Sequence, residues 1–428
     1  MRKAGNRFAR VTAVLALIAL VGAAAFGVYR IAGTALDRMF PPAASGVSPP
    51  PASSRASAPP ARESGTSAPA GAGKGVKAYS AAGAGDSGGV LGPYLGAARE
   101  KLSGMTLGQK VGQVFMFECP SAGAIKAIDD YSPGGYCLMG KDFAGKTAAQ
   151  VEKTLASYQN SSKIPMLLAC DEEGGTVVRV SSNPALAAKK FASPRQVFAA
   201  GGLAAVTADT EKKAALLKSL GVNVNLAPVC DISTDPENFM YDRSLGQDPE
   251  TTAKFAAASV KAYEEKKVGS VLKHFPGYGS TKDTHEGPAR DTRSYQSFQK
   301  ANFLPFQAGM EAGAACVMIS HNTVESMDAE RPASLSPQVH AILREKLGFT
   351  GVVMTDSLSM GAVTQYMGKQ NPAVEAFLAG NDVLLTSDIA GSYNALYHAV
   401  ETGAITQKRL EESVARILAW KIELGLLH

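Results

Sequence analysis

The chain has 428 residues, of which 45% are apolar, so it is long enough to bury one large hydrophobic core or two ordinary ones. This composition excludes a wholly disordered protein. The formal net charge is only +5, and basic and acidic residues alternate in the second half of the chain without forming a basic stripe. Nucleic-acid binding is therefore not supported.

The first 32 residues have the pattern of an export segment. An uncharged stretch over 11–29 is close to the roughly 20 residues that span a bilayer. It is preceded by four basic residues, which are Arg2, Lys3, Arg7 and Arg10. A cleaved signal has a shorter apolar core of roughly 7 to 15 residues, so we expect residues 1–32 to stay as an anchor, with cleavage and secretion as the alternative. This predicts a single-pass protein of the cell membrane with an extracytoplasmic domain.

Residues 33–92 are dominated by Pro, Ala, Ser and Gly. Such a segment buries too little apolar surface to offset the entropy of ordering its backbone. We predict a disordered linker that holds the rest of the chain away from the membrane.

The five cysteines show no CxxC or Cys/His ligand spacing, and each lies in an apolar run. Their odd number argues against a disulfide framework, even in an exported protein. We expect neither a metal site nor any other cofactor, and we expect a monomer.

From residue 93 to residue 428, short apolar runs alternate with longer amphipathic stretches, which is typical of repeated βα units and a parallel sheet. The eight runs that we predict as strands are 113–118, 136–140, 166–171, 222–231, 270–275, 315–321, 351–356 and 382–388. Eight such units predict the α/β class and a single (β/α)₈ TIM-type barrel. Residues 406–427 have apolar positions at helical spacing and should close the barrel as its last helix, with Trp420 as a packing residue.

Ionisable side chains lie at the C-terminal ends of seven of these runs. They are Glu118, Asp171, Asp231, Lys273 with His274, His321, Asp356 and Asp388. The C-terminal ends of barrel strands form the face that carries active sites, so the pattern predicts a catalytic face.

The segment 273–294 contains the most specific motif. A Pro-Gly turn and a second glycine follow the strand and release a long loop that returns an Asp-Thr-His triplet to the barrel mouth. In an extended segment Asp283 and His285 point the same way, so the carboxylate can accept the ring N–H and fix the imidazole tautomer. We predict an acid/base pair.

Retaining cleavage of a glycosidic bond requires a second carboxylate on the other side of the sugar. Asp356, at the end of its apolar run, is the best placed candidate for a nucleophile. Neighbouring basic groups at the barrel mouth should keep this carboxylate ionised. A strand-end aspartate can instead serve as a helix N-cap.

Six segments together resemble glycoside hydrolase family 3, and within it the β-N-acetylhexosaminidase branch, over residues 100–428. They are ACDEEGGTVVRV, YDRSLGQDP, LKHFPGYG, DTH, SHNTVESMDAERPASLSP and VVMTDSLSM. The resemblance implies that Asp356 is the nucleophile and His285 the acid/base, assisted by Asp283. It also implies that sugar hydroxyls are bound by Asp171, Arg179, Arg243, Lys273 and His274.

The β-glucosidase branch of the family usually takes its acid/base from a further C-terminal domain. The triplet and the little chain left after the last predicted helix favour the N-acetylhexosaminidase branch, whose members commonly act on β-linked N-acetylglucosamine in peptidoglycan fragments. Tyr278 departs from the family, which often has His at this position of the sugar-binding segment. The substrate implied is a glycan that contains N-acetylglucosamine, derived from the cell wall.

Three other functions remain open. A neutral histidine does not repel phosphate, so a phosphorylase is an alternative. A metal-dependent barrel hydrolase usually needs an HxH pair on its first strand, which the run 113–118 lacks. A non-catalytic cell-wall-binding relative would be marked by loss of Asp356 or His285, and both are present.

Overall fold

The computed structural model describes residues 89–279 and 281–428. The predicted anchor over 1–32 and nearly all of the predicted linker over 33–92 lie outside the described residues. None of the helices in the described part of the chain is both long and apolar enough to cross a membrane.

Eight parallel strands form one sheet that curls into a nearly closed barrel. Neighbours in the barrel follow the order of the chain, and the last strand returns to pair with the first, where Phe115 lies opposite Leu384. A bridge between Met354 and Val383 spans the seam between the seventh and eighth strands. The strands are β1 Phe115–Glu118, β2 Gly135–Leu138, β3 Leu167–Cys170, β6 Val224–Asn225, β7 Gly269–Phe275, β9 Cys316–Ile319, β11 Val352–Thr355 and β12 Leu384–Thr386.

Each of the eight predicted runs overlaps a barrel strand, although most strands are shorter than the run and β2 and β7 begin one residue before it. The largest difference is in the run 222–231, where only Val224–Asn225 is regular strand. Pro228 has no N–H to donate to a neighbouring strand, so the ladder is interrupted before Val229 forms an isolated bridge with Lys273. The first strand was predicted to begin at residue 113 but begins at Phe115, because Gln113 is the last residue of helix α3.

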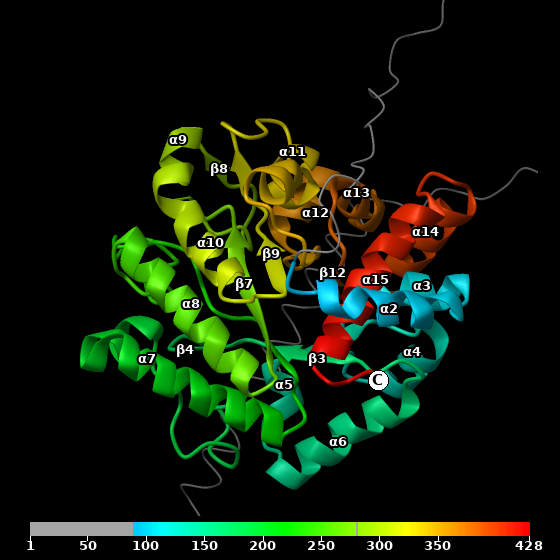
Figure 1. Ribbon diagram of the computed structural model, residues 1–428, viewed down its shortest axis with the longest axis horizontal. Coiled ribbons are helices and arrows are strands. Elements are labelled where there is room, and N and C mark those ends of the chain that lie inside the picture. Colours follow the sequence, from blue (N-terminus) through cyan, green and yellow to red (C-terminus); the bar gives the residue numbers. More distant parts are fainter. Residues whose placement is uncertain (1–88, 280) are drawn as a thin grey trace, which may run out of the picture. The chain divides into compact units, whose positions relative to one another are not determined.

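Helices surround the strands in Figure 1. They are α2 Leu95–Ser103, α3 Leu107–Gln113, α4 Ala124–Tyr131, α5 Gly140–Phe143, α6 Ala148–Ser161, α7 Pro194–Ser219, α8 Pro249–Glu265, α9 Tyr295–Ser297, α10 Phe303–Glu311, α11 Pro337–Ala341, α12 Gly361–Met367, α13 Pro372–Ala379, α14 Ile389–Glu401 and α15 Gln407–Glu423. Local sequence sets their starts. At α8, the Asp248 carboxylate accepts the N–H of Thr251 at 2.8 Å, and Pro249 occupies a position whose N–H would have no helical partner.

The last helix packs as predicted. In Figure 1 the red α15 lies beside the blue-cyan α2, and the two helices are in contact. Trp420 is 1% exposed and packs against the start of β7. A side chain at Gly269 would come within 2.8 Å of the Trp420 ring, so glycine permits this close approach. The helix therefore contributes to the hydrophobic core that surrounds the barrel.

Short strands extend the loops at the C-terminal ends of the barrel. After β3, the strands β4 Glu172–Gly174 and β5 Val177–Val178 form an antiparallel pair. After β7 and β9, the strands β8 Arg290–Asp291 and β10 Thr323–Val324 pair in parallel. These loops frame the candidate active site.

Candidate active site

A pocket of about 310 Å³ opens at the C-terminal ends of the strands. Its lining includes all eight residues that the sequence suggested for the site, namely Asp171, Arg179, Arg243, Lys273, His274, Asp283, His285 and Asp356. They come from the ends of β3, β7 and β11 and from the loops that follow β5, β6 and β7. The structure therefore brings the candidates together, while their individual roles stay predictions.

Lys273 lies at the centre of a buried network of charges. Its ammonium is 2.6 Å from the Asp171 carboxylate and 2.6 Å from that of Glu173. Burial alone would lower the pKa of Lys273, but the two carboxylates outweigh it and raise the pKa, so the side chain stays charged. A lysine held between two carboxylates has little freedom to move, which fixes its position on the pocket wall.

Glu173 is a site residue that sequence reasoning missed. Its two oxygens accept two hydrogen bonds from Arg243, at 2.9 Å from Nε and 2.7 Å from Nη2. Burial would raise the pKa of Glu173, but Arg243 and Lys273 lower it well below its usual range. A buried charge is tolerated only when it is paired in this way, so Glu173 is the counter-ion that holds both cations at the pocket.

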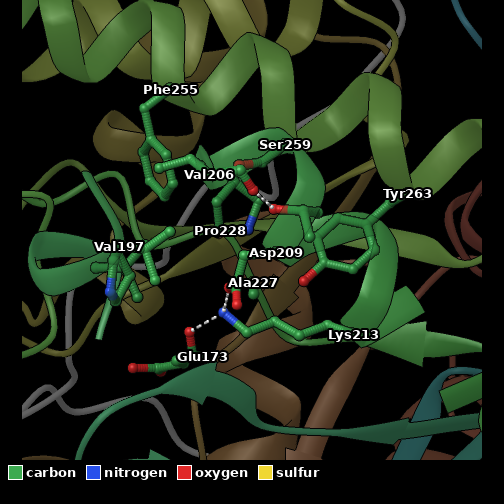
Figure 2. A pocket seen from close by; sticks show the side chains of 13 residues that line it. Glu173, Val197, Val206, Asp209, Lys213, Ala227, Pro228, Phe255, Ser259 and Tyr263 are labelled. Carbon is green, nitrogen blue, oxygen red and sulfur yellow. Dashed lines mark hydrogen bonds and ion pairs between the residues drawn. The ribbon is translucent and has the colours of Figure 1, made fainter. Parts of the chain in front are cut away.

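The backbone of Glu173 is itself anchored from behind, as Figure 2 shows. Lys213 of α7 donates to the Glu173 carbonyl at 2.8 Å and forms an ion pair with Asp209 at 2.7 Å. These groups line a cavity of about 20 Å³ between α7, α8 and the end of β6, which is far too small for a sugar ring. We therefore interpret this second cavity as packing behind the site.

Arg179 reaches the pocket from the β4–β5 pair. Its guanidinium is 3.5 Å from the Asp171 carboxylate. The buried Glu172 carboxylate accepts the backbone N–H groups of Arg179 and Val180 at 2.9 and 2.7 Å. Glu172 thus shapes the turn that presents Arg179, whereas its neighbour Glu173 faces the charged network.

His274 is held in one tautomer by two partners. Its Nδ1 is 2.7 Å from the Asp231 carboxylate, and its Nε2 is 3.2 Å from Nη2 of Arg243. A guanidinium can only donate, so Nε2 accepts and the ring proton lies on Nδ1, toward Asp231. Burial would raise the pKa of Asp231, but the contacts with His274 and with two backbone N–H groups lower it. Asp231 therefore orients His274 and was not among the predicted site residues.

Asp356 follows β11 and is partly buried. Burial alone would raise the pKa of its carboxyl group. Several neighbouring groups act against that effect, first among them the His274 and His321 side chains. The backbone N–H of Ser357, 2.7 Å from Oδ1, and the Lys273 ammonium act in the same direction, so the pKa of Asp356 lies below its usual value. An ionised carboxylate on a strand end is the state that a nucleophile requires.

His321 lies behind Asp356 and is fully buried. Its Nε2 is 2.9 Å from the Ser357 carbonyl, which can only accept, so Nε2 carries the proton. Its Nδ1 then accepts from the Ser334 hydroxyl at 2.7 Å. Burial lowers the pKa of His321, in keeping with a neutral ring. His321 therefore fixes the backbone next to Asp356 as a neutral hydrogen-bonding group.

The Asp283/His285 pair forms, although not in the expected backbone conformation. His285 Nδ1 is 2.7 Å from Asp283 Oδ1, and the same oxygen accepts the His285 backbone N–H at 2.9 Å. Residues 284–286 form a turn, in which Glu286 donates to the Asp283 carbonyl, so the predicted extended segment is wrong. A carboxylate that bonds a backbone N–H two residues ahead favours a turn over a strand. The His285 side chain is 63% exposed and its Nε2 remains available to the pocket.

The remaining strand-end carboxylates serve other purposes. Asp388 caps α14 by accepting the N–H of Gly391 at 3.0 Å, and Glu118 forms a half-exposed ion pair with Lys141.

Across residues 89–279 and 281–428, no three His, Cys, Asp or Glu side chains are grouped so that they could hold a metal ion. The five cysteines are all buried and unpaired.

Comparison with known proteins places the chain in a family. The β-hexosaminidase A of Pseudoalteromonas piscicida is 31% identical over 326 residues, which cover 69% of this chain and 54% of that protein. The chain thus spans about half the length of this relative. A solved family 3 β-N-acetylglucosaminidase from Paenibacillus sp. str. FPU-7 is 31% identical with a TM-score of 0.71, covering 75% of this chain and 63% of that one.

A solved β-glucoside phosphorylase is 26% identical with a TM-score of 0.69, and the match covers 78% of this chain and 62% of that one. The model of the glycosyl hydrolase family 3 N-terminal domain matches residues 106–420, which is most of the chain and the whole of the barrel. This protein therefore belongs to glycosyl hydrolase family 3.

Proposed function

We propose that the protein is a retaining exo-β-N-acetylglucosaminidase that hydrolyses terminal β-linked N-acetylglucosamine through a covalent intermediate on Asp356. One observation carries the proposal: a single pocket contains an ionised carboxylate at a strand end and a separate Asp/His pair on a loop. Two groups of this kind are what retaining cleavage requires, with His285 in place of the usual acid/base carboxylate. The names of the β-hexosaminidase and β-N-acetylglucosaminidase relatives support the choice of sugar.

In the first step, a carboxylate oxygen of Asp356 forms a bond to the anomeric carbon as the glycosidic C–O bond breaks. The electron pair of that bond goes to the leaving oxygen, which takes the Nε2 proton of a protonated His285. Asp283 keeps the Nδ1 proton hydrogen-bonded and stabilises the imidazolium before transfer.

In the second step, neutral His285 accepts a proton from water as the water oxygen bonds to the anomeric carbon. The bond between that carbon and Asp356 breaks, and its electron pair returns to the carboxylate. Two inversions leave the configuration of the sugar unchanged.

The charged side chains around the pocket would bind the sugar hydroxyls. The group comprises Asp171, Arg179, Arg243, Lys273 and His274, whose mutual contacts fix their positions. Preorganised polar groups orient the ring for attack and select against sugars that lack the matching hydroxyls.

The covalent intermediate is the sharpest test. A fluorinated N-acetylglucosaminide that slows the second step should leave a sugar adduct, which peptide mass spectrometry should locate on Asp356. Asp356→Asn should lower kcat by at least about a thousandfold, because the nucleophile is lost. Asp388→Asn is the matched control, since Asp388 also follows a barrel strand but caps α14. An adduct on any other residue contradicts the proposal.

Phosphate is the alternative acceptor, and the similarity to a β-glucoside phosphorylase favours testing it. A histidine acid/base does not repel the phosphate dianion as a carboxylate does. Incubation of a nitrophenyl N-acetylglucosaminide with and without phosphate distinguishes the two reactions. Release of free sugar in both reactions supports hydrolysis, whereas sugar 1-phosphate formed in place of free sugar identifies a phosphorylase.

A β-glucosidase is the other alternative. Comparing the rate of cleavage of the nitrophenyl glucoside with that of the nitrophenyl N-acetylglucosaminide tests for it.

The natural substrate and the location are also part of the proposal. We infer a glycan of peptidoglycan fragments as substrate, and a catalytic domain held outside the cytoplasm by residues 1–32, because these residues combine basic side chains with an apolar stretch. Fractionation of cells that express the full chain tests the second point. Recovery of the intact chain from membranes supports an anchor, and a shortened chain in the medium supports signal cleavage.

A further inference from the structure

Thr284, between the two members of the acid/base pair, is fully buried, although it lies on an exposed loop. The side chains of its neighbours Asp283 and His285 are 33% and 63% exposed. Thr284 itself has no exposed surface. A threonine turned inward between two outward residues can determine where those residues stand.

The Thr284 hydroxyl meets a single side chain in the described residues, the Tyr278 hydroxyl at 2.7 Å. Tyr278 lies six residues earlier on the same loop and is also buried, at 2% exposure. Burial and the nearby Asp356 carboxylate raise the pKa of the Tyr278 phenol, so the hydroxyl keeps its proton. Each hydroxyl therefore satisfies the other, and removing one leaves the other buried without its partner.

Tyr278 is in turn held by Asp231, His274 and Phe239. Its backbone N–H donates to Asp231 at 2.7 Å, and Asp231 also holds His274. Its ring packs edge-on against the rings of His274 and Phe239, each with centroids 5.1 Å apart. Tyr278 thus connects the rigid end of β7 to the loop that carries His285.

The turn has two other attachments, to which it contributes only backbone carbonyls. The Thr284 carbonyl accepts the backbone N–H of Ala362 at 3.1 Å, and the Glu286 carbonyl accepts the side-chain amide N–H of Gln365 at 3.3 Å. Both bonds come from α12 and would persist without the two hydroxyls. The hydroxyl pair is therefore the side-chain contact that ties this turn to the barrel end.

We propose that Tyr278 is a positioning residue for the acid/base: through its hydroxyl bond to Thr284 it holds His285 where the Nε2 proton can reach the leaving oxygen. The inference rests on the proposed function, since it assumes that His285 is the acid/base. Proton transfer is sensitive to the placement of the donor, and general acid catalysis contributes about a hundredfold or more to such reactions. A displaced His285 should cost most of that contribution while Asp356 and sugar binding remain intact.

The test compares two substrates that share the sugar and differ in the leaving group. A dinitrophenyl N-acetylglucosaminide leaves without a proton, whereas an N-acetylglucosamine disaccharide needs one. Tyr278→Phe and Thr284→Val should each lower kcat/KM for the disaccharide by about tenfold or more and change it by less than about threefold for the dinitrophenyl substrate. Thr284→Ser keeps the hydroxyl and should restore the disaccharide activity.

The double variant should lose no more than either single variant, because both changes break one contact. Tyr136→Phe is the matched control: it removes another buried tyrosine hydroxyl, which is bonded to the Ala124 carbonyl away from the pocket. This control should leave the ratio of the two activities unchanged.

An equal loss on both substrates would overturn the inference, because it would indicate a general role in folding or in sugar binding. An unchanged disaccharide activity in Thr284→Val would overturn it as well. The variant His285→Ala distinguishes a failure of the proposed acid/base from a failure of the positioning role alone. If that variant shows no dependence on the leaving group, the proposed acid/base itself is wrong; if it shows the dependence and Tyr278→Phe does not, only the positioning role fails.

Discussion

At the scale of single residues, Glu173 is the counter-ion of two cations at the pocket. Its carboxylate is 1% exposed and neutralises part of the charge of both Arg243 and Lys273. Breaking such a buried pair is costly because it leaves an uncompensated charge in a medium of low polarity. Sugar binding through these two cations should therefore depend on a residue that need not contact the sugar.

Glu173→Gln tests that dependence. The amide keeps the shape but can accept only on one side and carries no charge, so Arg243 and Lys273 lose their fixed positions. We expect kcat/KM for a nitrophenyl N-acetylglucosaminide to fall by about a hundredfold, with a rise in KM as a large part of the loss. Glu118→Gln is the control, since Glu118 also forms an ion pair with a lysine, but at the end of β1 and with a half-exposed Lys141. Equal activity of the two variants would contradict the role given to Glu173.

The sequence predicted which residues line the pocket better than it predicted which of them contact one another. Six of the eight candidates lie at predicted strand ends or in the Asp-Thr-His motif, and Arg179 and Arg243 lie in segments that resemble the family. The barrel brings all eight to one pocket. Glu172 and Glu173 are adjacent and chemically identical, and only the irregular pairing of β4 with β5 decides which of them faces Lys273. That choice depends on long-range backbone geometry, which motif spacing does not contain.

At the scale of elements, the hydrophobic pattern was sufficient to predict the eight strands and the final helix. The pattern failed where a backbone feature interrupts it, as at Pro228 after β6 and in the turn at Thr284. It also missed a buried charge within α15. Lys421 of this helix has no exposed surface, and its ammonium is 2.6 Å from the Gln113 side-chain oxygen, a neutral partner.

Burial lowers the pKa of Lys421 from 10.5 to about 7. Between these two values the unfolded state binds a proton that the folded state releases, so stability rises with pH across this window. We expect the free energy of unfolding to increase by about 2 kcal/mol between pH 7 and 9 through this group alone. Urea unfolding of the wild type and of Lys421→Met at several pH values measures the difference.

Near pH 7, the free energy of unfolding of Lys421→Met should exceed that of the wild type. Near pH 9 this difference should disappear. Lys267→Met serves as the control, because the Lys267 side chain is 53% exposed beside Glu423. Parallel pH profiles for the wild type and Lys421→Met would show that the buried lysine does not titrate in this range.

At the scale of the whole molecule, the barrel closes at a seam between β11 and β12 that combines backbone hydrogen bonds with a buried cluster of charges. A bridge between Met354 and Val383 joins β11 to β12, and the backbone N–H of Asp382 donates to the Val353 carbonyl at 2.7 Å. The Asp382 carboxylate also accepts the N–H of Val353 at 3.0 Å. Three arginines surround this buried carboxylate, which are Arg344 at 2.6 Å, Arg416 at 3.2 Å and Arg409 at 3.6 Å.

These arginines come from the chain before β11 and from α15, so Asp382 joins the last strands to the helix that completes the barrel. Burial would raise the pKa of Asp382, but the arginines lower it to about 2. A carboxyl group with a depressed pKa contributes stability that is present above its unfolded value of 3.8 and is lost as the pH falls toward 2. The seam should therefore weaken as the pH falls through this range.

Asp382→Asn should reproduce that loss at neutral pH. The amide leaves three buried guanidinium groups without a counter-charge, so we expect the free energy of unfolding to fall by about 3 to 5 kcal/mol. Hydrogen exchange should accelerate first at the amides of Val353 and Thr355, which bond across the seam, and later at those of β2 and β3, which pair along their full length. The active-site pocket includes Asp356 from β11 and Leu385 from β12, so activity should decline in step with exchange at the seam. Uniform acceleration around the barrel would instead mean that the arginine cluster supports global stability without closing this seam.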